Sequence, residues 1–357
     1  MTIYSTTTFL FIAIYSFLFP AFLHGISIVP QIKLCAYSDC PSVSRIGMGT
    51  LHLGDNIEGL TDVNDIKAWI EEAYSLGITL FDLADVYPVK GGDAGTSATL
   101  FGQALAMTGL RDQVTLVAKM DIIFPSTIDT SREHLQSVLD WYLSVLMTDH
   151  VDILILHYSN SFMNATEVGQ FFIDTKAAGK AKYFGVSNHY PSKFDLLQSK
   201  LDEMTKGNIK LVTHEFEASV WNPSSMNYNN AIADHAYQLQ IHPLAWGSLA
   251  GDPIGGLNRL FVRTGDRQRK ILNALGDVGA QIGVTDESIV ALIWLLEHPV
   301  GFIPLLGTTK TARLRSQVTA FKNLGKMTVE QWWTIAGKGG LCALGDSQCN
   351  YSEYMAK

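Results

Sequence analysis

From about residue 45 onward, the chain alternates short apolar runs with longer segments of helical periodicity, and no other feature constrains the fold as strongly. Each run has the length of a strand, and its near-continuous apolar character is typical of strands buried on both faces. The eight runs are residues 46–51, 79–84, 114–120, 151–157, 182–188, 211–217, 241–247 and 302–307.

The segments between the runs are predicted to be amphipathic helices. Residues 62–77 carry their apolar side chains at helical spacing along one face. Residues 131–147 show the same spacing and follow Thr130-x-x-Glu133, which predicts a capping box at the start of that helix.

An alternation of this kind favours parallel strand pairing, because a connection between parallel strands must cross over the sheet. Eight such units close into a (β/α)8 TIM barrel of the α/β class. An open, doubly wound sheet is the alternative, but no Gly-x-Gly-x-x-Gly follows the first strand. No Pro-, Gly- or Ser-rich linker interrupts the pattern, so we expect a single barrel domain over residues 43–337.

Composition excludes several functional classes. The chain has 26 Lys and Arg against 34 Asp and Glu, and a net charge of −8. No cluster of basic residues is present, which argues against nucleic acid as a partner. With 47% hydrophobic and 17% charged residues, the chain can bury a large core and does not resemble a disordered or coiled-coil protein.

The N-terminus is apolar and contains no Asp, Glu, Lys or Arg through Pro30. Its apolar stretch, residues 9–23, is shorter than the roughly 20 residues that span a membrane and has the length of a signal-peptide core. We expect residues 1–27 to be a signal peptide cleaved after Ser27, which places the protein in the secretory pathway or outside the cell. The start lacks the usual basic residues, so a membrane anchor through residues 9–23 or an organelle-targeting segment is the alternative.

The four cysteines form two short-range pairs outside the barrel. Cys35 and Cys40 lie in an N-terminal extension, residues 28–42, and Cys342 and Cys349 lie in a C-terminal tail, residues 338–357. In an oxidising compartment both pairs are expected to be disulfides, each worth about 2 kcal/mol because its loop is short. No Cys-x-x-Cys occurs and the histidines lack ligand spacing, so no metal site is predicted.

In a TIM barrel, chemistry belongs at the C-terminal ends of the strands. Four consecutive predicted strands end in titratable or polar side chains, and Lys119 follows an apolar run that buries it. A buried lysine needs a partner, and Asp82 is the candidate. A nearby ammonium lowers the pKa of Tyr87 from about 10 toward neutrality, so Tyr87 is predicted to donate a proton near pH 7.

Five motifs at these strand ends resemble the aldo-keto reductases, most closely the bacterial YdhF-like oxidoreductases. They are FDLADVY, TLVAKM, LILHYS, YFGVSNH and IPLLGTTKTARLRSQ, in the family's order, and the resemblance covers residues 43–337. It implies a monomeric barrel that binds NADPH and reduces aldehydes or ketones. It also places the catalytic tetrad on Asp82, Tyr87, Lys119 and His157.

The resemblance further implies a set of cofactor-binding residues. They are Gly49 and Thr50 on the first strand, Ser187 and Asn188 at the carboxamide, Trp246 against the nicotinamide ring, Ser248 after it, and Thr308, Lys310, Arg313 and Gln317 around the adenosine phosphate. A guanidinium suits a 2′-phosphate and favours NADPH over NADH.

Glu215 departs from the family, which has Gln facing the carboxamide at this position. An ionised Glu only accepts hydrogen bonds, so the carboxamide oxygen loses a donor. Glu215 is therefore expected to weaken cofactor binding or to favour the cationic oxidised form.

The sequence thus predicts an NADPH-dependent oxidoreductase that acts on a small carbonyl substrate, with Tyr87 as the proton donor. The alternative is a non-catalytic NADP(H)-binding regulatory module, because the family's barrel also serves in potassium-channel beta subunits.

Overall fold

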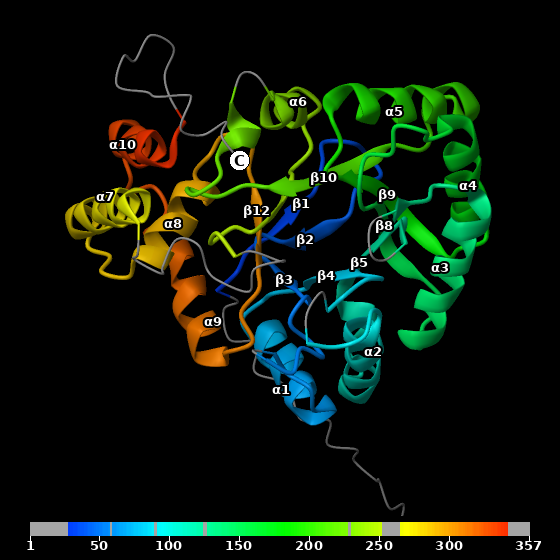
Figure 1. The fold of residues 1–357 in the computed structure, drawn as a ribbon, viewed down its shortest axis with the longest axis horizontal. Helices are drawn as coiled ribbons and strands as arrows, with labels where there is room; N and C mark the ends of the chain where they lie inside the picture. Colours follow the sequence, from blue (N-terminus) through cyan, green and yellow to red (C-terminus); the bar gives the residue numbers. More distant parts are fainter. Residues whose placement is uncertain are drawn as a thin grey trace, which may run out of the picture.

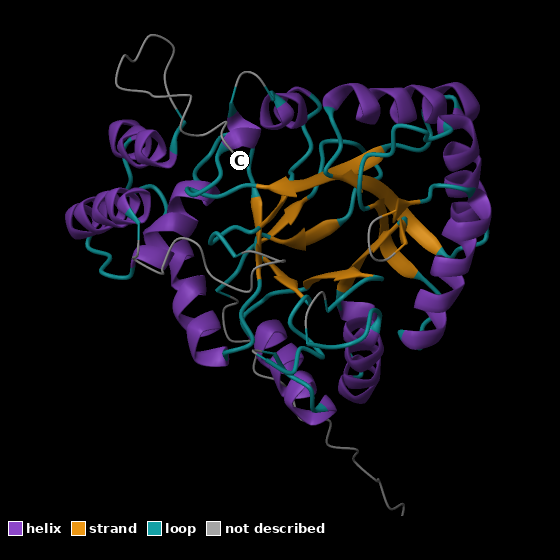
Figure 2. Cartoon of the chain, in the orientation of Figure 1, coloured by secondary structure: helices purple, strands orange, loops and turns teal. Residues whose placement is uncertain are grey.

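The computed structural model describes residues 28–57, 59–88, 91–123, 127–227, 230–251 and 265–341. Its centre is a closed barrel of eight parallel strands (Figures 1 and 2). Around the barrel the strands follow the order β10-β11-β12-β3-β4-β5-β8-β9. Their bounds are β3 Gly47–Gly49, β4 Leu80–Ala84, β5 Thr115–Met120, β8 Val151–Leu156, β9 Ala181–Ser187, β10 Leu211–Glu217, β11 Leu244–Trp246 and β12 Ile303–Leu306. Each coincides with one of the eight apolar runs, which confirms the predicted TIM barrel.

Helices surround the barrel, shown in purple around orange strands in Figure 2. Their bounds are α1 Val63–Ser75, α2 Thr96–Thr108, α3 Arg132–Val145, α4 Ala165–Ala177, α5 Pro191–Thr205, α6 Ile232–Gln238, α7 Asp266–Ile282, α8 Glu287–Leu296, α9 Thr311–Gln317 and α10 Val329–Gly339. Three 3₁₀ helices, η1 Arg111–Gln113, η2 Ser224–Met226 and η3 Val318–Asn323, and a small hairpin of β6 Ile122–Ile123 and β7 Thr127–Ile128 lie in the connections.

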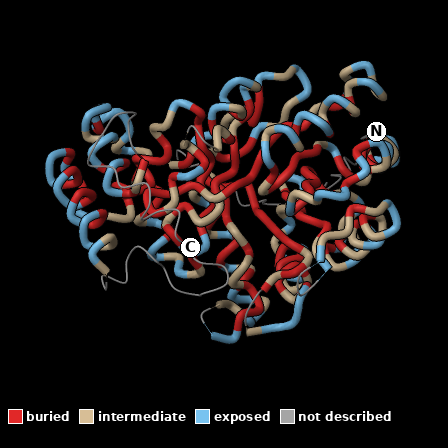
Figure 3. Tube along the Cα trace, turned by 45° about the horizontal axis from the view of Figure 1, so that its top comes forward, coloured by how far each residue is buried: buried red, intermediate tan, exposed pale blue. Residues whose placement is uncertain are grey.

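Both faces of the barrel strands are covered, as the red interior of Figure 3 shows. Every residue of β4 and β8 is buried, which explains why these strands are apolar apart from one aspartate each. Gly47 is needed where β3 meets its neighbours, because an added Cβ would lie 2.7 Å from Leu305 Cδ2 and 2.9 Å from Leu80 Cδ2.

The start of α3 differs from the prediction by one residue. Ser131 is the N-cap, and its hydroxyl accepts a hydrogen bond from the His134 amide at 3.4 Å. The Thr130 hydroxyl instead accepts from the side-chain amide of Asn160 at 3.3 Å. The predicted capping box was therefore wrong, because Thr130 makes a contact with another connection of the barrel.

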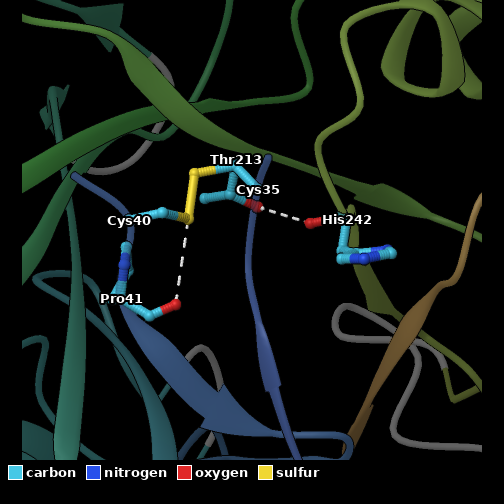
Figure 4. Close-up of a disulfide and its surroundings, with 5 residues drawn as sticks. All are labelled: Cys35, Cys40, Pro41, Thr213 and His242. Atoms are coloured by element: carbon cyan, nitrogen blue, oxygen red, sulfur yellow. Dashed lines mark hydrogen bonds between the residues drawn. A yellow bond between two sulfur atoms is a disulfide. The ribbon is translucent and has the colours of Figure 1, made fainter. Parts of the chain in front are cut away.

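An antiparallel hairpin, β1 Gln31–Lys33 and β2 Ser42–Ser44, precedes the barrel, and a disulfide between Cys35 and Cys40 closes the connection between its two strands (Figure 4). This confirms the first predicted cysteine pair. Cys342 and Cys349 lie outside the described residues, as does the apolar segment 1–27.

The hairpin packs on the N-terminal end of the barrel. The Leu34 carbonyl accepts a hydrogen bond from the His242 amide at 2.7 Å, just before β11. The Val29 amide donates to the Leu76 carbonyl at 3.0 Å, just before β4. Both contacts precede barrel strands, so the hairpin covers the end of the barrel opposite to the strand tips.

Arg45 stabilises the same end of the barrel through hydrogen bonds to backbone carbonyls. Its guanidinium donates to the carbonyls of Gly301 and Phe302, both at 2.6 Å, and to the Leu296 carbonyl at 3.1 Å. Burial lowers the pKa of this guanidinium to about 10.

No single helix in the described ranges has the length and apolar composition needed to cross a membrane. The bent pair α7 and α8, at 83°, meets these requirements only when the two helices are taken together.

Candidate functional site

The four residues of the predicted tetrad converge at the C-terminal end of the barrel. Asp82 lies on β4, Lys119 on β5 and His157 directly after β8, while Tyr87 follows β4. The Lys119 ammonium donates to Asp82 Oδ2, and its Nζ lies 5.3 Å from the centre of the Tyr87 ring. The rings of Tyr87 and His157 meet edge to face, 6.3 Å apart at 86°. Four side chains separated in the sequence therefore surround one point at the barrel mouth.

Glu215, from β10, adds a second carboxylate to this cluster. Its Oε1 accepts from Lys119 Nζ at 3.0 Å. Lys119, Asp82 and Glu215 are 1%, 2% and 1% exposed. Two buried oxygens, Asp82 Oδ1 and Glu215 Oε2, have no hydrogen-bond partner among the described residues.

The charges of these three groups are strongly coupled. Burial opposes the charge of Lys119, but the two carboxylates outweigh it and raise the pKa of the lysine well above its ordinary value. Burial raises the pKa of Asp82, and it raises that of Glu215 to about 8. One positive charge cannot stabilise two buried negative charges equally well, so the carboxyl pair retains a proton at neutral pH.

Lys119 lowers the pKa of Tyr87 as expected, but the expected net fall of this pKa toward neutrality is not met. Burial raises the pKa of Tyr87, and the charges of Asp82 and Glu215 add to burial, while Lys119 alone opposes them. The net direction is upward mainly because Tyr87 is buried, and the two carboxylates offset part of the effect of the ammonium. Tyr87 is therefore a phenol that can donate a proton, but its pKa does not fall toward neutral pH.

His157 is a neutral imidazole in this setting. Burial and then the charge of Lys119 hold its pKa well below the ordinary value. Its backbone amide donates to the Met120 carbonyl at 2.9 Å and to Asp121 Oδ2 at 3.0 Å, and its Nδ1 is buried without a partner among the described residues. A neutral imidazole held in this way can donate one hydrogen bond to a carbonyl oxygen.

Sequence reasoning missed three supporting residues. The Tyr142 hydroxyl, on α3, donates to the Lys119 carbonyl at 2.8 Å. Asp121 accepts from the amides of His157 and Tyr158, at 3.0 Å and 3.3 Å. Burial raises the pKa of Asp85 to about 7, and its Oδ1 has no partner in the part of the chain that the structure describes. Two of these acids directly follow β4 and β5, a position that could have identified them.

Three predicted cofactor residues, Ser187, Asn188 and Trp246, are joined by hydrogen bonds, and Asn188 connects them to the His157 carbonyl. Asn188 has a left-handed backbone, with φ 52°, and its amide group donates to the His157 carbonyl at 3.1 Å and to Ser187 Oγ at 3.0 Å. The Trp246 indole donates to Asn188 Oδ1 at 3.0 Å. The Trp246 ring is thus fixed relative to His157 through one amide side chain.

Two hydroxyls predicted to face the cofactor bond to the barrel instead. The Thr50 hydroxyl donates to the Asp82 carbonyl at 2.9 Å, and the Ser248 hydroxyl donates to the Leu305 carbonyl at 2.9 Å. Gly49 precedes Thr50 and has room, since an added Cβ would lie 3.8 Å from the Leu306 carbonyl oxygen. Thr50 therefore holds the strand that carries Asp82.

A separate group of predicted residues lies after β12 and on α9. Arg315, which is not one of the predicted residues, forms an ion pair with Glu72, with contacts of 2.6 Å and 2.7 Å. By contrast, Lys310 and Arg313 are exposed, and neither forms an ion pair with any residue that the structure describes.

Two further members of this group are buried. The Thr308 hydroxyl accepts from the Lys310 amide at 3.2 Å. The side chain of Gln317 is buried, with an Oε1 that lacks a partner within the described ranges. Two unpaired cations beside a buried amide fit a phosphorylated nucleotide, so the residues present are compatible with an NADP(H) cofactor.

Within the described ranges, no group of three or more His, Cys, Asp or Glu side chains could hold a metal ion. Most of the long connection after Ser248 falls in residues 252–264, outside the described residues.

Comparison with known proteins agrees with this geometry. The model of the aldo/keto reductase family matches residues 45–338. An uncharacterized oxidoreductase of Bacillus subtilis, YcsN, is 32% identical over 76% of this chain and 87% of its own length. A 6-dehydroglucose reductase of Agrobacterium fabrum is 31% identical over 84% of this chain and 97% of its own length. The oxidoreductase YdhF of Escherichia coli is 32% identical over 83% of this chain and 93% of its own length. With the family's model matched across the whole barrel and relatives above 30% identity, the chain belongs to the aldo/keto reductase family.

Proposed function

We propose that this protein is an NADPH-dependent oxidoreductase that reduces an aldehyde or ketone to an alcohol, with Tyr87 as the proton donor. One observation carries the proposal: a protonated Tyr87 and a neutral His157 lie edge to face beside the buried, charged Lys119. Reduced NADP, when bound, supplies the hydride to the carbonyl carbon.

The protein's own residues handle the carbonyl oxygen. Tyr87 gives its proton to this oxygen as negative charge develops there, a contribution of about 10²- to 10⁴-fold in rate. His157 orients the oxygen with a hydrogen bond, and Lys119 supports Tyr87 electrostatically. Asp82 fixes the lysine, and Tyr142 and Thr50 hold the strands that carry the pair.

We assign the cofactor's two ends to the two groups of residues described above. Ser187, Asn188 and Trp246 would hold the nicotinamide, and Gly49, Glu215 and Ser248 border it. Thr308, Lys310, Arg313 and Gln317 would hold the adenosine end, with the two unpaired cations on the 2′-phosphate.

The substrate is a small carbonyl compound. Ile123, Tyr158, Phe162 and Tyr190 are exposed apolar residues on the connections after β5, β8 and β9, at the same end of the barrel as Tyr87. They favour a substrate with an apolar or aromatic body. The name of the Agrobacterium relative adds an oxidised sugar to the compounds worth testing.

We further propose that the barrel acts as a monomer in the secretory pathway or outside the cell. The disulfide between Cys35 and Cys40 supports an oxidising compartment. Sequencing of the mature N-terminus tests this proposal: a start near Ile28 supports cleavage, whereas a retained Met1 in a membrane fraction supports the anchor.

The activity is tested by following NADPH absorbance in the presence of aromatic aldehydes, aliphatic aldehydes and oxidised sugars. We expect turnover by the wild type and a loss of at least 10²-fold for Tyr87→Phe, with NADPH affinity unchanged. Tight NADPH binding without turnover on any compound would refute the reductase and favour the regulatory module.

A further inference from the structure

Lys119 lies between two buried carboxylates that come from different walls of the barrel. Asp82 is on β4, next to the strand of Lys119, whereas Glu215 is on β10, which is not a neighbour of β5. The ammonium contacts both, with the Glu215 Oε1 contact at 3.0 Å. One carboxylate is enough to neutralise a buried lysine, so the second leaves the cluster with excess negative charge when both are ionised.

The excess charge lies directly beside Tyr87. Lys119 Nζ is 5.3 Å from the centre of the Tyr87 ring, so a carboxylate bound to that ammonium is also close to the phenol. The free oxygens, Asp82 Oδ1 and Glu215 Oε2, are buried and have no partner among the described residues that would disperse their charge.

We propose that Glu215 is a positioning residue for the reaction: by sharing the Lys119 ammonium with Asp82, it keeps the Tyr87 hydroxyl protonated in alkaline solution and so favours proton donation over proton abstraction. This inference rests on the proposed reductase activity for its kinetic consequence, but the state of the Tyr87 hydroxyl is a property of the protein alone.

The other groups that face Tyr87 do not supply this charge. His157, after β8, is neutral because burial and Lys119 hold its pKa low. Tyr142, on α3, is itself a phenol whose pKa is raised by burial and by neighbouring acids. Burial raises the pKa of Asp85, after β4, to about 7, but Asp85 is not among the groups that shift the pKa of Tyr87. The charged neighbours that decide the state of Tyr87 are therefore Lys119 and its two carboxylates.

The pH determines whether Tyr87 can act as a proton donor or as a base. Reduction of a carbonyl needs the phenol, whereas oxidation of an alcohol needs the phenolate as the base. The carboxyl pair has released its last proton well before Tyr87 ionises, because burial and Asp82 raise the pKa of Glu215 only to about 8. The full negative charge is then present when Tyr87 begins to titrate.

The direct test is the ionisation of Tyr87 in the protein without cofactor. Tyrosine labelled with ¹³C at Cζ reports phenolate by NMR, and the Tyr87 signal is assigned by its absence in Tyr87→Phe. For the wild type, we expect Tyr87 to remain a phenol through pH 10. For Glu215→Gln, which keeps the shape and removes the charge, we expect the midpoint to fall by about 1 to 2 pH units.

Glu217→Gln is the matched control. Glu217 lies two residues further along β10 and is half-buried. It accepts a hydrogen bond from the side-chain amide of Asn222 at 2.7 Å, whereas the Lys119 ammonium donates its hydrogen bonds to Asp82 and Glu215. We expect this variant to leave the Tyr87 midpoint at the wild-type value. Glu215→Asp restores a carboxylate and should return the midpoint toward the wild type.

The kinetic test uses the pH profiles of reduction and oxidation. In Glu215→Gln, the alkaline fall of reduction and the rise of oxidation should both move to lower pH, with a tenfold gain in phenolate for each pH unit by which the Tyr87 midpoint falls. An unchanged Tyr87 midpoint in Glu215→Gln, or a wild-type Tyr87 that ionises below pH 9, overturns the inference. The wild-type measurement can overturn the inference even if the variant fails to fold. Absence of turnover with a lowered midpoint would refute the reductase and leave the role of Glu215 at Tyr87 standing.

Discussion

Replacement of Asp85 by Asn should stabilise the protein at pH 8 but not at pH 4. Asp85 follows β4 at the edge of the site, and its buried Oδ1 has no partner in the described part of the chain. Burial raises the pKa of this carboxyl from 3.8 to about 7, against smaller opposing effects of backbone amides and Lys119. The folded protein therefore binds the proton more tightly than the unfolded chain does.

The sign and size of the effect follow from this difference. Between pH 4 and pH 7 the unfolded chain has lost the proton that the folded state retains, so the free energy of unfolding falls as the pH rises through this window. A rise in pKa from 3.8 to about 7 spans about 3 pH units, which at about 1.4 kcal/mol for each pH unit gives an upper limit of about 4 kcal/mol. Asn has no proton to lose and removes this penalty.

Urea unfolding at pH 4, 6 and 8 measures the difference between the variant and the wild type. We expect a difference near zero at pH 4 that grows to a few kcal/mol at pH 8. Asp121 contributes in the same direction, because the charge of Asp85 helps to raise its pKa.

Asp62→Ala is the contrasting control for this experiment. The backbone amides of Asn64 and Asp65 lower the pKa of Asp62 at the start of α1, so its stabilising effect is present above pH 4 and is lost on acidification. This variant should therefore be less stable than the wild type by a similar amount at pH 8, pH 6 and pH 4, because the effect is lost only below the ordinary pKa of 3.8. A gain for Asp85→Asn that is the same at all three pH values would refute the reasoning.

Two further substitutions test the cofactor assignment and the base of the barrel. Arg313→Ala should weaken NADPH binding about tenfold or more and NADH binding little, because it removes one charge-assisted hydrogen bond to the 2′-phosphate. Binding is measured by tryptophan fluorescence. Arg315→Ala, on the same helix but paired with Glu72, should leave both affinities unchanged, and equal losses in the two variants would contradict the assignment. Arg45→Leu should lower the free energy of unfolding by about 1 to 3 kcal/mol, because it leaves the carbonyls of Gly301 and Phe302 without their donor. Thermal unfolding measures this effect, and an unchanged midpoint would show that water replaces the guanidinium.

The sequence was sufficient for the barrel because its strands are buried on both faces. Each strand is therefore a nearly continuous apolar run, and the helices between them keep a distinct period. The four residues at the strand tips followed from the same topology, since parallel strands end at one edge. Local contacts were less accessible: Ser131 rather than Thr130 caps α3, because Thr130 contacts Asn160 from a connection distant in the sequence.

The electrostatics of the site could not be read from the sequence. The prediction that Lys119 lowers the pKa of Tyr87 counted one lysine and one partner, Asp82. The structure buries Tyr87 and brings Glu215 from 96 residues away onto the same ammonium, and burial, with the two carboxylates adding to it, raises the pKa of Tyr87. A pKa in a buried cluster depends on every charge that the fold brings near it, and such contacts leave no local pattern.

The hairpin at the base of the barrel also determines how the protein can be attached to other structures. Ile28 and Val29 lie at the end of the barrel opposite to Tyr87, held there by the contact between Val29 and Leu76. A membrane, a resin or a fusion partner joined to the chain before Ile28 therefore approaches the back of the barrel. Tethering at this point leaves the mouth open to solvent, so an immobilised form should keep the substrate access of the free protein.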